Sequence, residues 1–159
     1  MNEKTKYLAQ SGIIASLYVV LTMISTMLSL SSGVIQLRLS ECLCVLPIFI
    51  PSAVPGLAIG CFVSNLVSGC VIWDVVFGTL ATLVGAIFTR LMRKTGIFAV
   101  IPTIIANAVA VPLVLTFAYH VKEAFPILVL SVTTGEILSV FLLGGLLYRL
   151  MKNNEQLWK

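Results

Sequence analysis

The sequence contains few charged residues. Of its 159 residues, ten are Lys or Arg and six are Asp or Glu, together 10% of the chain, and there is one His. Soluble domains carry about 25% charged residues, whereas 59% of this chain is hydrophobic and its mean hydropathy is +1.09. This composition excludes a soluble globular protein and predicts a multi-pass protein of the cell membrane.

Motifs for catalysis and nucleotide binding are also missing. The sequence has no Gly-rich phosphate loop, no nucleophile elbow, no His-Glu-x-x-His pattern and no His/Cys cluster at metal-ligand spacing. We therefore expect no enzyme activity, no cofactor, no metal site and no use of ATP by this chain itself. Its four cysteines lie in or beside apolar segments and are expected to pack as small buried residues.

What the sequence does contain is a series of long runs without Asp, Glu, Lys or Arg. They cover residues 7–37, 42–73, 75–89 and 95–121, and a spanning helix needs about 20 residues. The first run is too long for a signal peptide and lacks a cleavage pattern, so we expect it to be retained. Prolines break the second run near residues 51–52.

These runs predict an all-α integral membrane protein, a six-helix transmembrane bundle that forms a single domain over residues 1–159. The expected helices cover about 7–30, 40–50, 53–67, 74–93, 97–119 and 124–150. Six helices place both termini on one side, with most of the basic residues, which are Lys4, Lys6, Arg90, Arg93, Lys94, Arg149, Lys152 and Lys159. Only Arg38 and Lys122 fall on the other side. The positive-inside rule then predicts cytoplasmic termini. The net charge of +4 comes from basic residues at helix ends, as membrane topology requires, so we expect no nucleic-acid partner.

Several polar residues interrupt the apolar segments, where an ion costs several kcal/mol unless it is paired or faces a polar cavity. Glu136 and Asn107 fall near mid-membrane, and the others fall in the outer half. We expect eight residues to line a small-molecule site, namely Gln36, Arg38, Glu41, Asn65, Trp73, Asp74, Asn107 and Glu136. Acids outnumber the one arginine in this set, so the ligand should be rich in N–H donors and could be cationic.

Each of these residues also has a structural interpretation. Arg38 and Glu41 could form an ion pair that fixes a loop, and Asp74 could cap a helix. Asn65 and Asn107 could hold helices together. Trp73 could belong to the aromatic belt at the membrane interface, or stack on a planar ligand.

Small residues at helical spacing mark faces that pack closely. The first expected helix carries two such pairs, Ser11 with Ala15 and Gly12 with Ser16. The fourth carries an inward-facing stripe of mostly small residues, which are Asp74, Phe77, Gly78, Ala81, Thr82, Gly85 and Thr89.

Three segments occur in a characteristic order, which are Gln36-x-Arg38-x-Ser40-Glu41 continuing into Leu43-x-Val45-Leu46-Pro47, then Gly56-x-x-Ile59-Gly60 with Ser64-Asn65, then Asp74-x-x-Phe77-Gly78-Thr79-Leu80-Ala81-Thr82-Leu83. This combination resembles the QueT family, the queuosine-precursor substrate-binding (S) components of energy-coupling factor (ECF) transporters.

The resemblance implies a six-helix S component that captures queuine or another 7-deazaguanine, such as 7-aminomethyl-7-deazaguanine, outside the cell. It also implies three partners, a transmembrane coupling subunit and two ATPase subunits, with docking through a small-xxx-small pair. S components typically show Ala-x-x-x-Ala there, and this chain has Ser11-x-x-x-Ala15.

Other functions stay open at this stage. One is an S component for another vitamin, for instance a thiamine-like cation. A second is a proton-coupled secondary transporter that uses Glu136 as its relay acid. A third, a small structural or assembly subunit, would explain the small-residue stripes but not the buried acids.

Overall fold

The computed structural model describes residues 2–30 and 37–154, and these residues form helices without any strand. In chain order the elements are α1 (Glu3–Met27), the 3-10 helix η1 (Leu39–Ile48), α2 (Ala53–Val67), α3 (Ile72–Leu91), the 3-10 helix η2 (Arg93–Val100), α4 (Ile101–Phe117), α5 (Phe125–Ile137), the π-helical η3 (Leu138–Leu143) and α6 (Gly144–Asn153). The all-α prediction is therefore confirmed.

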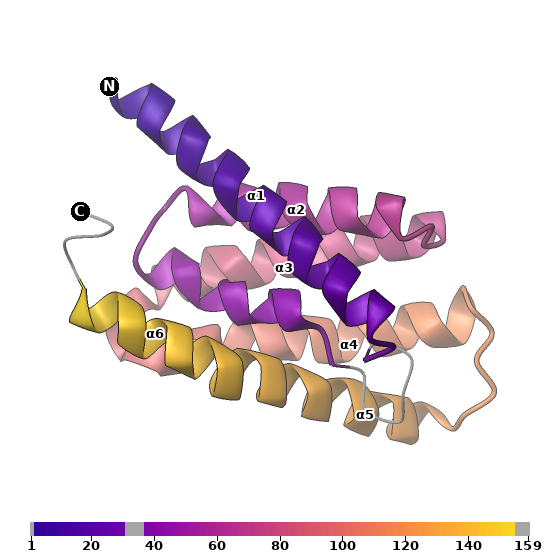
Figure 1. The fold of residues 1–159 in the computed structure, drawn as a ribbon. Helices are drawn as coiled ribbons and strands as arrows, with labels where there is room; N and C mark the ends of the chain where they lie inside the picture. Colours follow the sequence, from indigo (N-terminus) through magenta and orange to yellow (C-terminus); the bar gives the residue numbers. More distant parts are fainter. Residues whose placement is uncertain (1, 31–36, 155–159) are drawn as a thin grey trace.

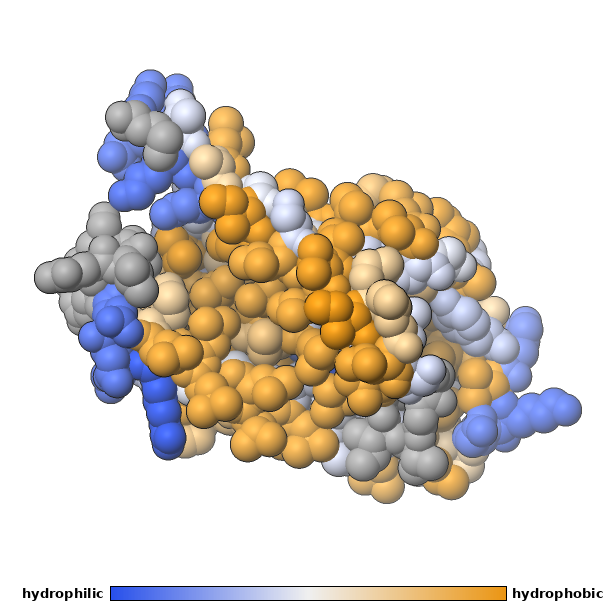
Figure 2. All heavy atoms as spheres, in the orientation of Figure 1, coloured by the Kyte–Doolittle hydropathy of each residue, from blue (hydrophilic) through white to orange (hydrophobic). Residues whose placement is uncertain are grey.

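Several of these elements join end to end. Among the described residues, four helical rods are long and apolar enough to cross a membrane, namely Glu3–Met27, Ile72–Leu91, Arg93–Phe117 and Phe125–Asn153. The third is kinked at Gly96, whose φ of 67° is not helical. η1 and α2 are apolar but shorter. The surface between the two ends of the bundle is mainly hydrophobic, and hydrophilic residues gather at the ends (Figure 2). The chain is a multi-pass protein of the cell membrane.

The two ends of the bundle differ in the chain segments that they hold. The first turn of α1 and the last turn of α6 lie at one end, on the left of Figure 1. The α2–α3 and α4–α5 connections lie at the opposite end. Arg38, which leads into η1, borders the same cavity as Cys70 and Tyr119 of these connections.

η1 is the centre of the bundle. It packs against α1, α2, α3, η2, η3 and α6. Its residues from Leu43 to Ile48 are buried, and most of them belong to one of the two hydrophobic clusters of the core. Pro47 has no backbone N–H, which disfavours a regular α-helix here. Arg90 of α3 donates to the carbonyl oxygens of Pro47 and Ile48, at 3.1 and 3.2 Å, and so satisfies acceptors at the end of η1.

α1 and α2 pack closely through small residues of both helices. A side chain at Gly60 would meet Tyr18 Cβ at 2.7 Å and the Ala15 carbonyl oxygen at 3.0 Å. Ser11 lies one turn away in the same interface and donates to the Ser52 carbonyl oxygen at 2.9 Å. Ser11 and Ala15, the expected docking pair, are thus buried inside the protein against α2.

The small-residue stripe of α3 faces inward as predicted, with one exception. Its six other members are buried, but Phe77 is 47% exposed. The prediction for Phe77 is wrong because this ring stacks on Trp73 on the outer surface, with ring centroids 6.0 Å apart. Residues spaced by three and four positions form a broad stripe on a helix, so a residue at the margin of the stripe, such as Phe77, can face outward.

Candidate functional site

Two small cavities lie side by side at the end of the bundle that holds the α2–α3 and α4–α5 connections. One has a volume of about 170 Å³ and is lined by Thr22, Ser25, Thr26, Arg38, Asn65, Ser68 and Cys70. The other has a volume of about 210 Å³ and is lined by Arg38, Cys70, Asp74, Val111, Val114, Leu115 and Tyr119. Arg38 and Cys70 border both cavities. We call this pair of cavities the upper tier.

Asp74 supplies the negative charge of the upper tier. It lies in the first turn of α3, is 5% exposed, and accepts a hydrogen bond from the Tyr119 hydroxyl to Oδ2 at 3.2 Å. Asn65 of α2 donates to the Asp74 backbone carbonyl at 3.3 Å. Gly78 makes room for this contact, because a Cβ there would stand 3.1 Å from the Asn65 amide nitrogen. Asp74 does not cap α3, since the helix begins two residues earlier at Ile72.

Arg38 supplies the positive charge. It is partly buried at the start of η1 and forms no hydrogen bond or ion pair within the described residues. Asp74 and Glu41 are close enough to favour its charge electrostatically. The proposed ion pair of Arg38 with Glu41 is therefore not formed as a direct contact, and the guanidinium borders both cavities with its donors unused.

Tyr119 links Asp74 to the end of α4. Its oxygen donates to Asp74 and accepts from the Val71 backbone N–H at 3.2 Å. Burial raises the pKa of the Tyr119 phenol to about 12, so the hydroxyl is protonated at neutral pH and can donate. Burial, followed by the nearby Asp74 carboxylate, also raises the pKa of the Cys70 thiol.

A second group of polar residues lies about one helical turn below these cavities. Tyr18 and Asn107 stand four residues from the cavity-lining Thr22 and Val111, on the inner side, which corresponds to a depth of about 5 Å. Together with Glu41 and Glu136 they form what we call the lower tier. All four side chains are buried.

Hydrogen bonds within the lower tier join four elements, α1, η1, α4 and α5. Tyr18 of α1 donates to Glu41 Oε1 at 2.5 Å, and Cys44 donates to Glu41 Oε2 at 3.1 Å. Asn107 of α4 donates through Nδ2 both to Glu41 Oε2 at 3.4 Å and to Glu136 Oε1 at 3.1 Å. One amide thus joins two buried carboxylates, from η1 and α5.

The structure therefore brings together six of the eight residues predicted for the site. Arg38, Asn65 and Asp74 lie in the upper tier, and Glu41, Asn107 and Glu136 in the lower tier. Trp73 lies elsewhere, because it is 57% exposed and borders a separate apolar cavity with Phe77 and α4. Gln36 lies outside the described residues.

Sequence reasoning missed three residues that border the tiers, Tyr18, Cys70 and Tyr119. The prediction of fully buried cysteines holds for Cys44 and Cys61, whereas Cys42 and Cys70 are only partly buried. The one sequence signal for Tyr18 is its place four residues before Thr22, on a face of α1 that also carries the hydroxyls of Ser25 and Thr26. The hydroxyls on that face, including Thr22, mostly bond back to their own helix.

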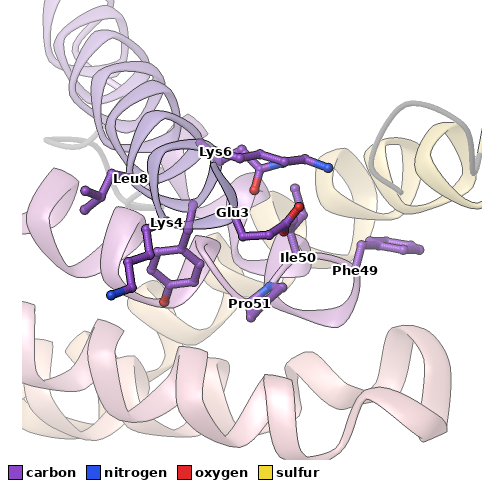
Figure 3. A pocket seen from close by; sticks show the side chains of 9 residues that line it. Glu3, Lys4, Lys6, Leu8, Phe49, Ile50 and Pro51 are labelled. Atoms are coloured by element: carbon purple, nitrogen blue, oxygen red, sulfur yellow. The ribbon is translucent and has the colours of Figure 1, made fainter. Parts of the chain in front are cut away.

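A larger cavity, of about 660 Å³, opens at the opposite end of the bundle. Its lining comes from the first two turns of α1 and from residues 49–51 after η1. Figure 3 shows Lys4, Glu3 and Lys6 around it, with the ring of Phe49 at one side. It contains none of the predicted site residues. Within the described residues, no group of three His, Cys, Asp or Glu side chains could hold a metal ion.

A family profile described as "QueT transporter" matches residues 8–153. The chain belongs to the QueT transporter family. It is also similar to the protein named Queuosine precursor transporter QueT of Lactococcus lactis subsp. cremoris (strain MG1363), with 40% identity over 81 residues. That alignment covers 51% of this chain and 47% of the relative, so the match spans about half the length of each. No solved structure matches the chain significantly.

Membership of the QueT transporter family confirms the resemblance seen in the sequence and agrees with a multi-pass protein of the cell membrane. The profile includes α1 to α6 almost completely, and with them both tiers of the site.

Proposed function

We propose that this protein is the S component of an ECF-type importer that captures a queuosine precursor, a 7-deazaguanine base, and delivers it to the cytoplasm. The observation that carries the proposal is the convergence of Arg38, Asp74 and Asn65 on two adjoining cavities, with two buried acids about one helical turn deeper in the bundle. The name of the Lactococcus relative supports the substrate class. No nucleotide-binding motif occurs in the chain, so coupling and ATPase subunits would supply the energy.

The chemistry of the upper tier fits a guanine-like edge. Such an edge offers a ring N–H and an amino group side by side, and a carboxylate can accept from both donors at once. Asp74 has the required carboxylate, and Arg38 has donors for the carbonyl oxygen of the base. Cavities of 170 and 210 Å³ are smaller than the roughly 300 Å³ at which drug-sized sites begin, as suits a bicyclic base.

The orientation follows from charge. Basic residues gather at the end of the bundle that holds the first turn of α1 and the last turn of α6, so this end faces the cytoplasm. The upper tier then faces the exterior, where an importer must bind its cargo.

Docking on the coupling subunit would use α1. Since Ser11 and Ala15 pack against α2, the pair left for a partner helix is Gly12 with Ser16. Both are exposed, and nothing stands within 4 Å of a Cβ built on Gly12. Small residues allow close approach of helices in a membrane.

Binding measurements on the purified protein test the substrate class. Saturable binding is expected for 7-deazaguanines such as queuine, 7-aminomethyl-7-deazaguanine or 7-cyano-7-deazaguanine, and not for thiamine. Binding of thiamine alone would assign the protein to another vitamin. Absence of binding for the whole panel would overturn the proposal.

A second candidate function is favoured by the buried acid pair, which could relay protons in a secondary transporter. Uptake into vesicles distinguishes the two. An S component requires the ATPase subunits and ATP, whereas a proton-coupled carrier works without them when a pH gradient is present.

A further inference from the structure

The two acids of the lower tier receive very different numbers of hydrogen bonds. Glu41 accepts from the Tyr18 hydroxyl, the Cys44 thiol and the Asn107 amide. Glu136 accepts from Asn107 alone, through Oε1, and its Oε2 is buried without a partner in the described chain. Hydrogen bonds to the charged form of a carboxylate favour that form, and Glu136 receives only one shared hydrogen bond for its two oxygens.

The charges around Glu136 do not compensate a second buried anion. η1 presents Glu41 and Cys44 to it, α4 presents the neutral Asn107, and Tyr18 of α1 stands behind Glu41. The nearest cation is Arg38, which contacts neither acid directly among the described residues. Two buried carboxylates that share one neutral amide cannot both be ionised at low cost, because neither has a paired cation.

Within the part of the chain that the structure describes, two further buried polar atoms close to these acids in sequence lack a hydrogen-bond partner. Ser139 Oγ follows Glu136 by three residues at the start of η3, and Ser40 Oγ precedes Glu41 in η1. η1 and η3 pack against each other. Buried polar groups without partners are rare in proteins. Three of them on adjoining elements therefore indicate hydrogen-bond acceptors that a bound ligand would use.

We infer that Glu136 holds a proton in the empty protein and exchanges it for a positively charged amino group of the ligand. This inference rests on the proposed function, because it concerns the same site. On binding, the O–H bond of Glu136 breaks, the proton passes to solvent water, and the carboxylate accepts an N–H of the incoming ammonium. One positive charge leaves and one enters, so the buried charge is unchanged.

The depth of the lower tier fits such an arm. A base held at Asp74 and Arg38 lies about one helical turn, roughly 5 Å, above the acids. The nitrogen of an aminomethyl group stands about 2.5 Å from the ring, and an N–H···O hydrogen bond of about 2.9 Å covers the remaining distance. An ammonium has three donors and no acceptor, which matches a tier with unused acceptors. The ligand class is therefore a 7-deazaguanine with a cationic arm, and a neutral nitrile in that place is the poorer ligand.

Titration calorimetry of the full-length protein tests the exchange with 7-aminomethyl-7-deazaguanine and 7-cyano-7-deazaguanine. Each is measured at pH 7 in two buffers with different heats of ionisation, which reveals proton release. We expect the amine to bind at least about tenfold more tightly and to release about one proton, and the nitrile to release none. Equal affinity for both ligands, or amine binding without proton release, would overturn the inference.

Two matched substitutions sharpen the test. In Glu136→Gln the side chain keeps its shape but has no proton to exchange, so amine affinity should fall by at least about tenfold, nitrile affinity should stay the same, and proton release should vanish. Glu123→Gln removes an exposed acid from the α4–α5 connection and should behave like the parent protein. An equal loss for both ligands in Glu136→Gln would contradict the exchange.

Infrared spectroscopy of the empty protein separates this inference from the proposed function, since it needs no ligand. The C=O stretch of a protonated carboxyl should appear at pH 7 in the parent protein and in Glu123→Gln, and be absent from Glu136→Gln. If the band is present and neither base binds, the substrate class is wrong while the protonated acid stands. If the band is absent from the parent protein, the inference is wrong whatever binds.

Discussion

Asp74 has the surroundings of a residue that contacts a ligand directly. It lies in the first turn of α3, where the helix dipole favours a negative charge, and it borders a cavity together with Arg38. Tyr119 donates to one of its two oxygens. A carboxylate has about four acceptor positions, so several of them remain for donors that enter the cavity.

Asp74→Asn is expected to weaken binding of a 7-deazaguanine by about tenfold or more. The substitution keeps the size of the side chain but removes the charge, and charge-assisted hydrogen bonds contribute about 1.5–3 kcal/mol each. Calorimetry measures the change, with Glu123→Gln as a control that also removes one acid. Unchanged affinity in Asp74→Asn would remove Asp74 from the site.

At the residue scale, the sequence shows which polar side chains would be costly to bury without a partner, but it does not show the direction in which each side chain points. Glu41, Asp74 and Glu136 stand out because charges in apolar segments need a partner or a cavity. Trp73 and Asp74 are neighbours in the chain, yet one is exposed and the other buried. Neighbours on a helix point about 100° apart, and only the packed bundle decides which of them faces inward.

The elements themselves could largely be predicted, because apolar runs and prolines mark their limits. The predicted 53–67 helix coincides with α2, and the other predicted limits lie within about four residues of the observed ones. What could not be predicted is the winding of η1 and η3, which are 3-10 and π-helical. These forms depend on contacts such as Arg90 with the Pro47 carbonyl, which join residues 43 positions apart.

Close packing of α1 on α2 predicts that Gly60→Ala is destabilising. The new Cβ would stand 2.7 Å from Tyr18 Cβ, so the helices must move apart, and overpacking costs about 1–3 kcal/mol. The matched control is Gly12→Ala on the open face of α1, where Ala is favoured over Gly by up to about 1 kcal/mol. Melting curves in detergent should fall for the first variant and stay level or rise for the second. A Gly60→Ala protein as stable as the control would contradict the α1–α2 interface.

The end of η1 gives a second prediction at this scale. Arg90→Ala leaves the Pro47 and Ile48 carbonyl oxygens without their donor, and the loss should lower the free energy of unfolding by about 1–2 kcal/mol. Arg93 is exposed two residues after the end of α3, so Arg93→Ala should have little effect. The two melting temperatures in detergent measure the difference. Equal values would show that Arg90 does not support η1.

For the whole molecule, the main question is which end of the bundle binds the cargo. The 660 Å³ cavity of Figure 3 is the larger space, but it lies at the basic end, where its charged lining consists of Glu3, Lys4 and Lys6. The two tiers lie toward the other end and hold the buried acids and amides. The positive-inside rule predicts that the basic end faces the cytoplasm, so we expect the tiers to open to the exterior.

Cys70 provides a test of that orientation, because it is partly buried and borders both upper cavities. A maleimide that cannot cross membranes should label Cys70 in intact cells, and a bound 7-deazaguanine should protect it. The thiolate is the reactive form. Since burial and Asp74 raise the pKa of the Cys70 thiol, labelling should be slow at neutral pH and accelerate as the pH rises.

Two variants control this experiment. In a Cys42→Ser background, used because Cys42 is also partly buried, Cys70→Ser should abolish external labelling, since the remaining Cys44 and Cys61 are buried. Asp74→Asn should speed labelling of Cys70 at neutral pH, since removal of the neighbouring negative charge lowers the pKa of the thiol toward its ordinary value. Labelling of Cys70 that requires broken cells would mean that the upper tier faces the cytoplasm, and the proposed direction of capture would then be reversed.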